Sequence, residues 1–146
     1  MQKIRALVDS YKQEFETLIA QTIDSKAEMA ETIAAHILAK GGKRLRPGLA
    51  IASHLCLGEP RTGLIPLALS MEMLHAASLL HDDVIDAGML RRGSPTANVQ
   101  WGNKRAILAG DFLFSRAFQF LQTYGGNEIV TRALQTALDL TEGEFL

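Results

Sequence analysis

Three aspartates near the middle of the chain, Asp82, Asp83 and Asp86, are the residues whose spacing most clearly suggests chemistry. Asp82 and Asp86 are four residues apart, so on a helix their carboxylates share one face, about 6 Å from each other. At an effective dielectric constant of 20, two such charges repel by roughly 3 kcal/mol. The end of a helix adds to this cost, because the helix dipole disfavours anions there. A cation bound between the carboxylates would compensate for the repulsion.

The ligand types indicate a hard divalent cation. Carboxylate oxygens without cysteine favour Mg²⁺, with Asp82 and Asp86 as its ligands. Magnesium held by one or two carboxylates usually takes its other ligands from water and substrate phosphate, so the spacing also suggests a phosphorylated substrate. A solvated acidic helix end explains the spacing alone equally well. An EF-hand is excluded, because the aspartates do not alternate and no glutamate closes the loop.

Two basic clusters flank the aspartates. The segment GGKRLRP, residues 41–47, places Lys43, Arg44 and Arg46 at a predicted helix start, where backbone N–H groups favour anions. Arg91 and Arg92 follow the aspartates, and guanidinium groups match phosphate oxygens in two-point contacts. A basic surface loop is the alternative for either cluster. A P-loop is excluded, because Arg44 stands where that motif needs serine or threonine.

A histidine shares the acidic face of the same predicted helix. His75 precedes Asp82 by seven residues, which places it two turns earlier on that face. A single histidine on a buried helix is more often a core residue whose hydrogen bonds are satisfied. Its alignment with the aspartates makes a ligand-binding role equally reasonable, so both interpretations stay open.

Helical spacing of apolar residues predicts the elements that must position these side chains. We expect an all-α chain of about six helices and no strand. The longest helix runs from Leu64 to about Asp86 and is apolar nearly all round, so it should be central and buried. A loop should follow from Ala87 to about Asn98. Other helices are expected over residues 7–19, 29–38, 47–57 and 104–124, and from about 127.

Composition excludes several classes. Apolar residues make up 47% of the 146 residues, and the net charge of −1 argues against broad nucleic-acid binding. The single cysteine, Cys56, excludes a disulfide framework, fits a reducing compartment and is expected in the core. The polar N-terminal segment does not look like a signal peptide, and no run suggests a membrane span. We therefore expect a cytoplasmic protein.

Together these motifs resemble the trans-isoprenyl diphosphate synthases, the polyprenyl synthetase family. The resemblance runs through GGKRLRP, MEMLHAASLLHDDVID, the RRG that follows, GNKRAILAGDFLFSRAF and the final LTEGEFL. It implies an isoprenoid-synthase-type helical bundle that condenses isopentenyl diphosphate with an allylic diphosphate. It also implies Mg²⁺ as cofactor and a homodimer formed through residues 104–146.

The resemblance also implies a role for each site residue. Asp82 and Asp86, assisted by Asp83, would hold Mg²⁺ against the allylic diphosphate, which Arg91 would contact. Asp111, in the GDFL segment, would be structural or would support a site residue from behind, because it lies within an apolar packed helix. Ala77 and Ser78, one turn before the aspartates, would leave a tunnel open for a long-chain product. The diphosphate of isopentenyl diphosphate would be bound by four residues: Lys43, Arg46, His75 and Arg92.

Family members are typically about twice this length, so we expect residues 1–146 to be the N-terminal half of one polyprenyl synthetase domain. The second aspartate-rich motif would lie in the other half, and this chain alone is expected to be inactive. Residues Thr141 to Leu146 look like the middle of a helix, which favours the same conclusion. A non-catalytic small subunit of a heteromeric synthase and a terpene cyclase are the alternatives.

Overall fold

The structure is a computed structural model that describes the chain apart from residues 1–5, 7–9, 40–43 and 58–61. Lys43 therefore lies outside the described residues. The helices are α2 (Lys12–Ile23), α3 (Glu28–Ala39), α4 (Leu45–Cys56), α5 (Leu64–Ile85), α6 (Ala97–Trp101), α7 (Asn103–Phe120) and α8 (Asn127–Gly143), with a π-helical turn, η1 (Leu121–Gly125), between the last two. The predicted all-α architecture is confirmed.

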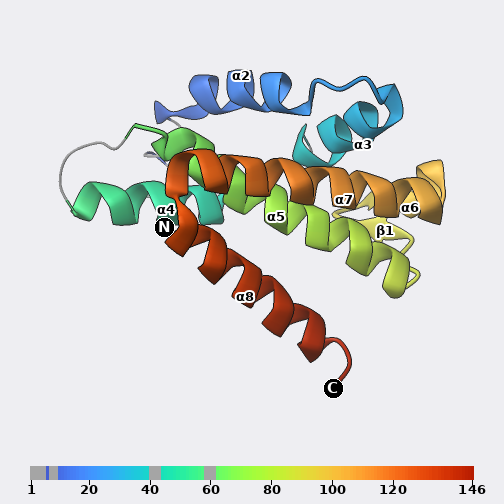
Figure 1. The fold of residues 1–146 in the computed structure, drawn as a ribbon. Helices are drawn as coiled ribbons and strands as arrows, with labels where there is room; N and C mark the ends of the chain where they lie inside the picture. Colours follow the sequence, from blue (N-terminus) through green and yellow to red (C-terminus); the bar gives the residue numbers. More distant parts are fainter. Residues whose placement is uncertain (1–5, 7–9, 40–43, 58–61) are drawn as a thin grey trace.

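The helix α5 is the centre of the fold, as its apolar composition predicted. It lies side by side with α7, and α2 and α3 lie along one side of this pair, with α3 in contact with both helices and α2 in contact with α5 (Figure 1). Leu69, Ala77 and Leu80 of α5 are fully buried. The sequence suggested no membrane span, yet α5 is long and apolar enough to cross a membrane, judged by length and composition alone. However, 56% of the relevant window is buried inside the protein, as in a core helix.

The predicted helix over residues 104–124 is confirmed as α7 and the π turn that continues it. Gly126, with a φ of 81°, ends this run, and α8 begins at Asn127 as expected. The expectation of helix through Leu146 was wrong, because α8 ends at Gly143, a poor helix-forming residue. None of the residues of α8 is buried, and Figure 1 shows the helix pointing away from the bundle.

The segment predicted as a loop contains a hairpin and a short helix. Strands β1 (Leu90–Arg91) and β2 (Ser94–Pro95) pair antiparallel, with Arg91 opposite Ser94. Their two-residue connection has positive φ at both positions, 53° at Arg92 and 78° at Gly93, as a tight hairpin turn requires. Strands of two residues are too short to show alternation, so the sequence could not reveal them. The helix α6 follows at once.

Cys56 was expected in the core, but it is exposed at the last position of α4. Ile51 and Pro47 of that helix are fully buried, and Cys56, five residues after Ile51, points about 140° away from Ile51 around the helix axis. Periodicity therefore located the helix correctly, but it did not place this residue on the right face.

Candidate active site

The helix α5 delivers Asp82 and Asp86 to the edge of the bundle. Asp86 is the C-terminal cap of α5, and its backbone N–H donates to the carbonyl of Asp82 at 2.8 Å. Asp82 is half-buried and Asp86 is exposed. Neither carboxylate has an ion pair or a side-chain hydrogen bond within the part of the chain that the structure describes. The two carboxylates are therefore available to an added cation.

Asp83 has a different environment from its neighbours. Its side chain is only 6% exposed and accepts hydrogen bonds from Nε and Nη2 of Arg91, the shortest at 2.8 Å. This hydrogen bond, followed by the charges of Asp83, Asp82 and Asp86, raises the pKa of the Arg91 guanidinium. Asp83 is thus neutralised by an arginine, and Arg91 also lies within the field of the two available carboxylates.

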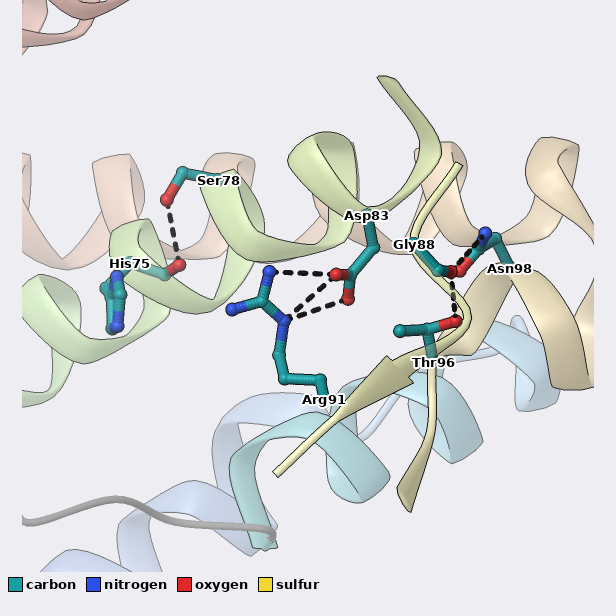
Figure 2. A network of polar contacts seen from close by, with 7 residues as sticks. All are labelled: His75, Ser78, Asp83, Gly88, Arg91, Thr96 and Asn98. Carbon is teal, nitrogen blue, oxygen red and sulfur yellow. Dashed lines mark hydrogen bonds and ion pairs between the residues drawn. The ribbon is translucent and has the colours of Figure 1, made fainter. Parts of the chain in front are cut away.

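The hairpin that carries Arg91 is held to the end of α5 by backbone contacts as well. Figure 2 shows Thr96 and Asn98 converging on the carbonyl oxygen of Gly88, at 2.7 Å and 3.1 Å respectively. The N–H of Thr96 also donates to the carbonyl of Met89 at 3.1 Å. These bonds fold the segment after the aspartates back along α5, so Arg91 reaches Asp83.

A small cavity of about 110 Å³ lies between α3, α5 and the hairpin. His75, Arg91 and Arg92 line it together with Asp83 and Glu72. The structure therefore brings together three of the predicted diphosphate-binding residues, although His75 lies on α5 and the two arginines lie in the hairpin. Asp82 and Asp86 are not among the residues that line this cavity.

The charges around this cavity favour an anion. Burial lowers the pKa of His75 below its ordinary value of 6.5, and the nearby positive charge of Arg46 lowers it further. Glu72 acts in the opposite direction, while Arg92 and Arg91 again lower it. Arg46 itself is exposed at the start of α4. A histidine surrounded by three arginines indicates a local excess of positive charge, which an anionic ligand would neutralise.

Arg44 belongs to the same basic segment, but its side chain contacts other protein groups. Its Nη1 is 2.7 Å from Oε1 of Glu72, its Nη2 donates to the carbonyl of Leu38, and its guanidinium lies over the ring of Phe15. Its backbone adopts the left-handed conformation, with a φ of 46°. Arg44 thus joins the start of α4 to α2, α3 and α5, so among the described residues of this segment Arg46 is the cation left for a ligand.

The predicted chain-length residues have unequal environments. Ala77 is fully buried, whereas Ser78 is half-buried and donates to the carbonyl of His75 at 3.0 Å. Ser78 precedes Asp82 by one helical turn and so shares its face. Neither residue lines the cavity beside His75.

Asp111 was expected within a packed helix face, but its side chain is 59% exposed. Its Oδ1 lies 3.4 Å from Nε2 of His81. The sequence analysis also missed Glu72, which anchors Arg44 and lines the cavity. An acidic residue inside the apolar stretch of α5 that precedes the aspartates is the signal that could have identified it, because a buried charge needs a partner.

The donor set fits a magnesium ion better than a metal bound by protein ligands alone. Among the described residues, no group of three or more His, Cys, Asp or Glu side chains converges as a metal site would require. Two available carboxylates, with room for water and phosphate oxygens, match the way in which proteins commonly bind Mg²⁺.

Comparison with known proteins gives a consistent result. The family model described as "Polyprenyl synthetase" matches residues 27–146. The all-trans-nonaprenyl-diphosphate synthase (geranyl-diphosphate specific) of Rhodobacter capsulatus is 41% identical over 130 residues, covering 88% of this chain and 40% of that protein. The octaprenyl diphosphate synthase of Escherichia coli is 32% identical over 146 residues, covering all of this chain and 45% of that protein.

A solved structure extends the similarity to the fold. The polyprenyl synthase of Caulobacter crescentus, complexed with calcium and isoprenyl diphosphate, superposes with a TM-score of 0.92 at 33% identity. The match covers 99% of this chain and 44% of that one. The chain thus spans less than half the length of each of these three proteins.

Proposed function

Because the chain belongs to the polyprenyl synthetase family, we propose that it carries the first diphosphate-activating site of a prenyltransferase. The reaction condenses isopentenyl diphosphate with an allylic diphosphate to give an all-trans polyprenyl diphosphate, for isoprenoid or quinone biosynthesis. The pair of available carboxylates, Asp82 and Asp86, beside a cluster of arginines is the observation that carries the proposal.

The allylic diphosphate would bind at the end of α5. Asp82 and Asp86 would hold Mg²⁺, which withdraws electron density from the diphosphate leaving group when bound. Arg91 would contact the same diphosphate, and Asp83 acts by holding that arginine in place. The bonds to Asp83 use Nε and Nη2 of Arg91, so Nη1, which makes no hydrogen bond among the residues described, is available to a phosphate oxygen.

The diphosphate of isopentenyl diphosphate would bind in the cavity beside α5. Arg92 and His75 line this cavity, and the charge of Arg46 acts on His75. Lys43 precedes Arg46 by three residues and completes the proposed set. A diphosphate here would raise the pKa of His75 and so favour an additional N–H donor to phosphate oxygen.

The residues suit a reaction without a protein nucleophile. The arginines compensate the charge that develops on the leaving diphosphate as the allylic C–O bond breaks. The double bond of isopentenyl diphosphate attacks the allylic cation, and a proton is then lost to the released diphosphate. The protein would bind both diphosphates and hold them beside one helix.

Product length and assembly are also part of the proposal. The small side chains of Ala77 and Ser78 favour a tunnel that accommodates a long chain. We propose that residues 1–146 form the N-terminal half of one polyprenyl synthetase domain, in a cytoplasmic homodimer. Apolar side chains on α7 and α8 support the dimer, since Leu108, Leu134 and Leu138 are each at least 50% exposed.

A chimera tests the proposed function in an intact enzyme. This chain would replace the aligned part of the octaprenyl diphosphate synthase of Escherichia coli, and labelled isopentenyl diphosphate and farnesyl diphosphate would be supplied. Elongated chains, lost in the Asp82→Asn variant, support the prenyltransferase. Cyclic hydrocarbon would indicate a terpene cyclase. No conversion by a folded chimera would favour a non-catalytic subunit.

A further inference from the structure

One side chain next to the aspartates contacts α7 instead of the candidate active site. His81 immediately precedes Asp82, and its Nε2 lies 3.2 Å from the carbonyl oxygen of Ile107 and 3.4 Å from Oδ1 of Asp111. Both of these atoms are hydrogen-bond acceptors, so His81 must carry a proton on Nε2 to bond with either of them. The imidazole thus connects the last turns of α5 to the surface of α7.

The close approach of the imidazole depends on a glycine. A Cβ atom at Gly110 would lie 2.3 Å from Nε2 of His81 and 2.7 Å from its Cδ2. Glycine is a poor helix former, yet Gly110 lies inside the 18-residue helix α7. The absent side chain creates the space that the imidazole occupies, so any larger residue at this position would displace the ring.

The geometry of a helix relates this contact to the aspartates. Successive residues are rotated by about 100°, so Asp83 points about 200° away from His81, nearly to the opposite side of α5. His81 therefore contacts α7 on one side, and Asp83 bonds to the hairpin through Arg91 on the other. Asp82 and Asp86 lie on the face between these two attachments. A helix end that is held on both sides cannot rotate or fray.

We propose that His81 is a positioning residue, seated against Gly110 and Asp111 of α7, which fixes the direction of the Asp82 and Asp86 carboxylates. This inference rests on the proposed function of those carboxylates, but it concerns a contact outside the diphosphate-binding residues. Asp111 would act by accepting a hydrogen bond from His81.

The test uses carbon-13-labelled samples of this chain. The variants are Gly110→Ala, which removes the space, His81→Ala, which removes the ring, and His81→Gln, which keeps an N–H donor. Gly143→Ala is the matched control, because a Cβ there meets nothing within 4 Å. Two quantities are measured: the carboxyl signals of Asp82 and Asp86 without metal, and the Mg²⁺ concentration that half-shifts them in the presence of inorganic pyrophosphate.

We expect Gly110→Ala and His81→Ala to move the metal-free carboxyl signals and to raise the half-shifting Mg²⁺ concentration at least tenfold. His81→Gln should recover part of this loss, and Gly143→Ala should behave like the unmodified chain. If the carboxyl signals of both His81→Ala and Gly110→Ala coincide with those of the unmodified chain, the inference is wrong. If the unmodified chain does not respond to Mg²⁺ and pyrophosphate, the proposed function fails, while the metal-free signals still decide the role of His81.

Discussion

Asp82, Asp83 and Asp86 differ in environment because different elements face them. Asp83 points toward the hairpin and is neutralised by Arg91, whereas Asp82 and Asp86 have no cation among the residues described. The residue types and spacing predict the outer pair as metal ligands, and this assignment stays a prediction. The partner of Asp83 could not be predicted in this way, because it depends on how the hairpin folds back onto α5.

Matched substitutions separate these roles. Asp83→Asn should lower the free energy of unfolding by about 2 kcal/mol, because the partly buried Arg91 loses a charged partner. Asp82→Asn should change it by less than about 0.5 kcal/mol, since that side chain has no partner to lose. Urea unfolding measures both values. Equal losses would show that Asp83 does not have the structural role described.

Arg44 and Arg46 form a second matched pair. Arg44→Ala should destabilise the fold by about 2–3 kcal/mol, because Glu72 would be left without its charge-assisted hydrogen bond. Arg46→Ala should leave stability within about 0.5 kcal/mol but weaken the binding of isopentenyl diphosphate, since Arg46 is exposed. Thermal unfolding and a binding titration distinguish the two, and a destabilised Arg46→Ala would contradict the assignment.

The lowered pKa of His75 predicts a dependence of stability on pH. The unfolded chain binds a proton at this site as the pH falls through about 6.5, while the folded chain resists it. The contribution of His75 to the free energy of unfolding is therefore fully present above about pH 7. It decreases as the pH falls from 6.5 toward the lowered pKa of the folded chain. His75→Asn should reduce the difference in melting temperature between pH 8 and pH 5.5. An unchanged difference would contradict the burial of this group beside positive charge.

At the scale of elements, long apolar periodicities were predicted well and short segments were not. The helix predicted from Leu64 to about Asp86 matches α5, because the 22 residues of that helix are mostly apolar and such a long apolar run indicates a buried helix. The hairpin and α6 are too short to show a period, and their bonds to Gly88 are tertiary contacts. The environment of Arg91 follows from these short elements, so sequence reasoning assigned it to substrate without its protein partner.

The helix α5 also provides the test of product length. Ala77 is fully buried, so a large side chain there would cost about 1–3 kcal/mol in packing. Ser78→Tyr places the same bulk on the face that carries Asp82, at a half-buried site. In the chimera, Ser78→Tyr should shorten the product, as thin-layer analysis of the labelled chains would show. A product of unchanged length would refute the tunnel along this face.

At the scale of the whole molecule, the predicted isoprenoid-synthase-type fold is confirmed, since the superposition on a solved polyprenyl synthase has a TM-score of 0.92. The chain spans 45% of the Escherichia coli relative, and α8 contributes no buried residue. Periodicity identified α8 as a helix but could not indicate that it points away from the bundle, because the spacing of apolar residues does not define the direction in which a helix leaves its neighbours.

The central claim is that Asp82 and Asp86 bind a divalent cation together with an allylic diphosphate. Titration calorimetry of the folded chain with farnesyl diphosphate, in the presence and absence of Mg²⁺, tests it most directly. We predict saturable heat that requires Mg²⁺ and disappears in the double variant Asp82→Asn, Asp86→Asn but persists in Gly143→Ala. Binding that is absent with Mg²⁺, or equally strong in the double variant, would contradict the claim.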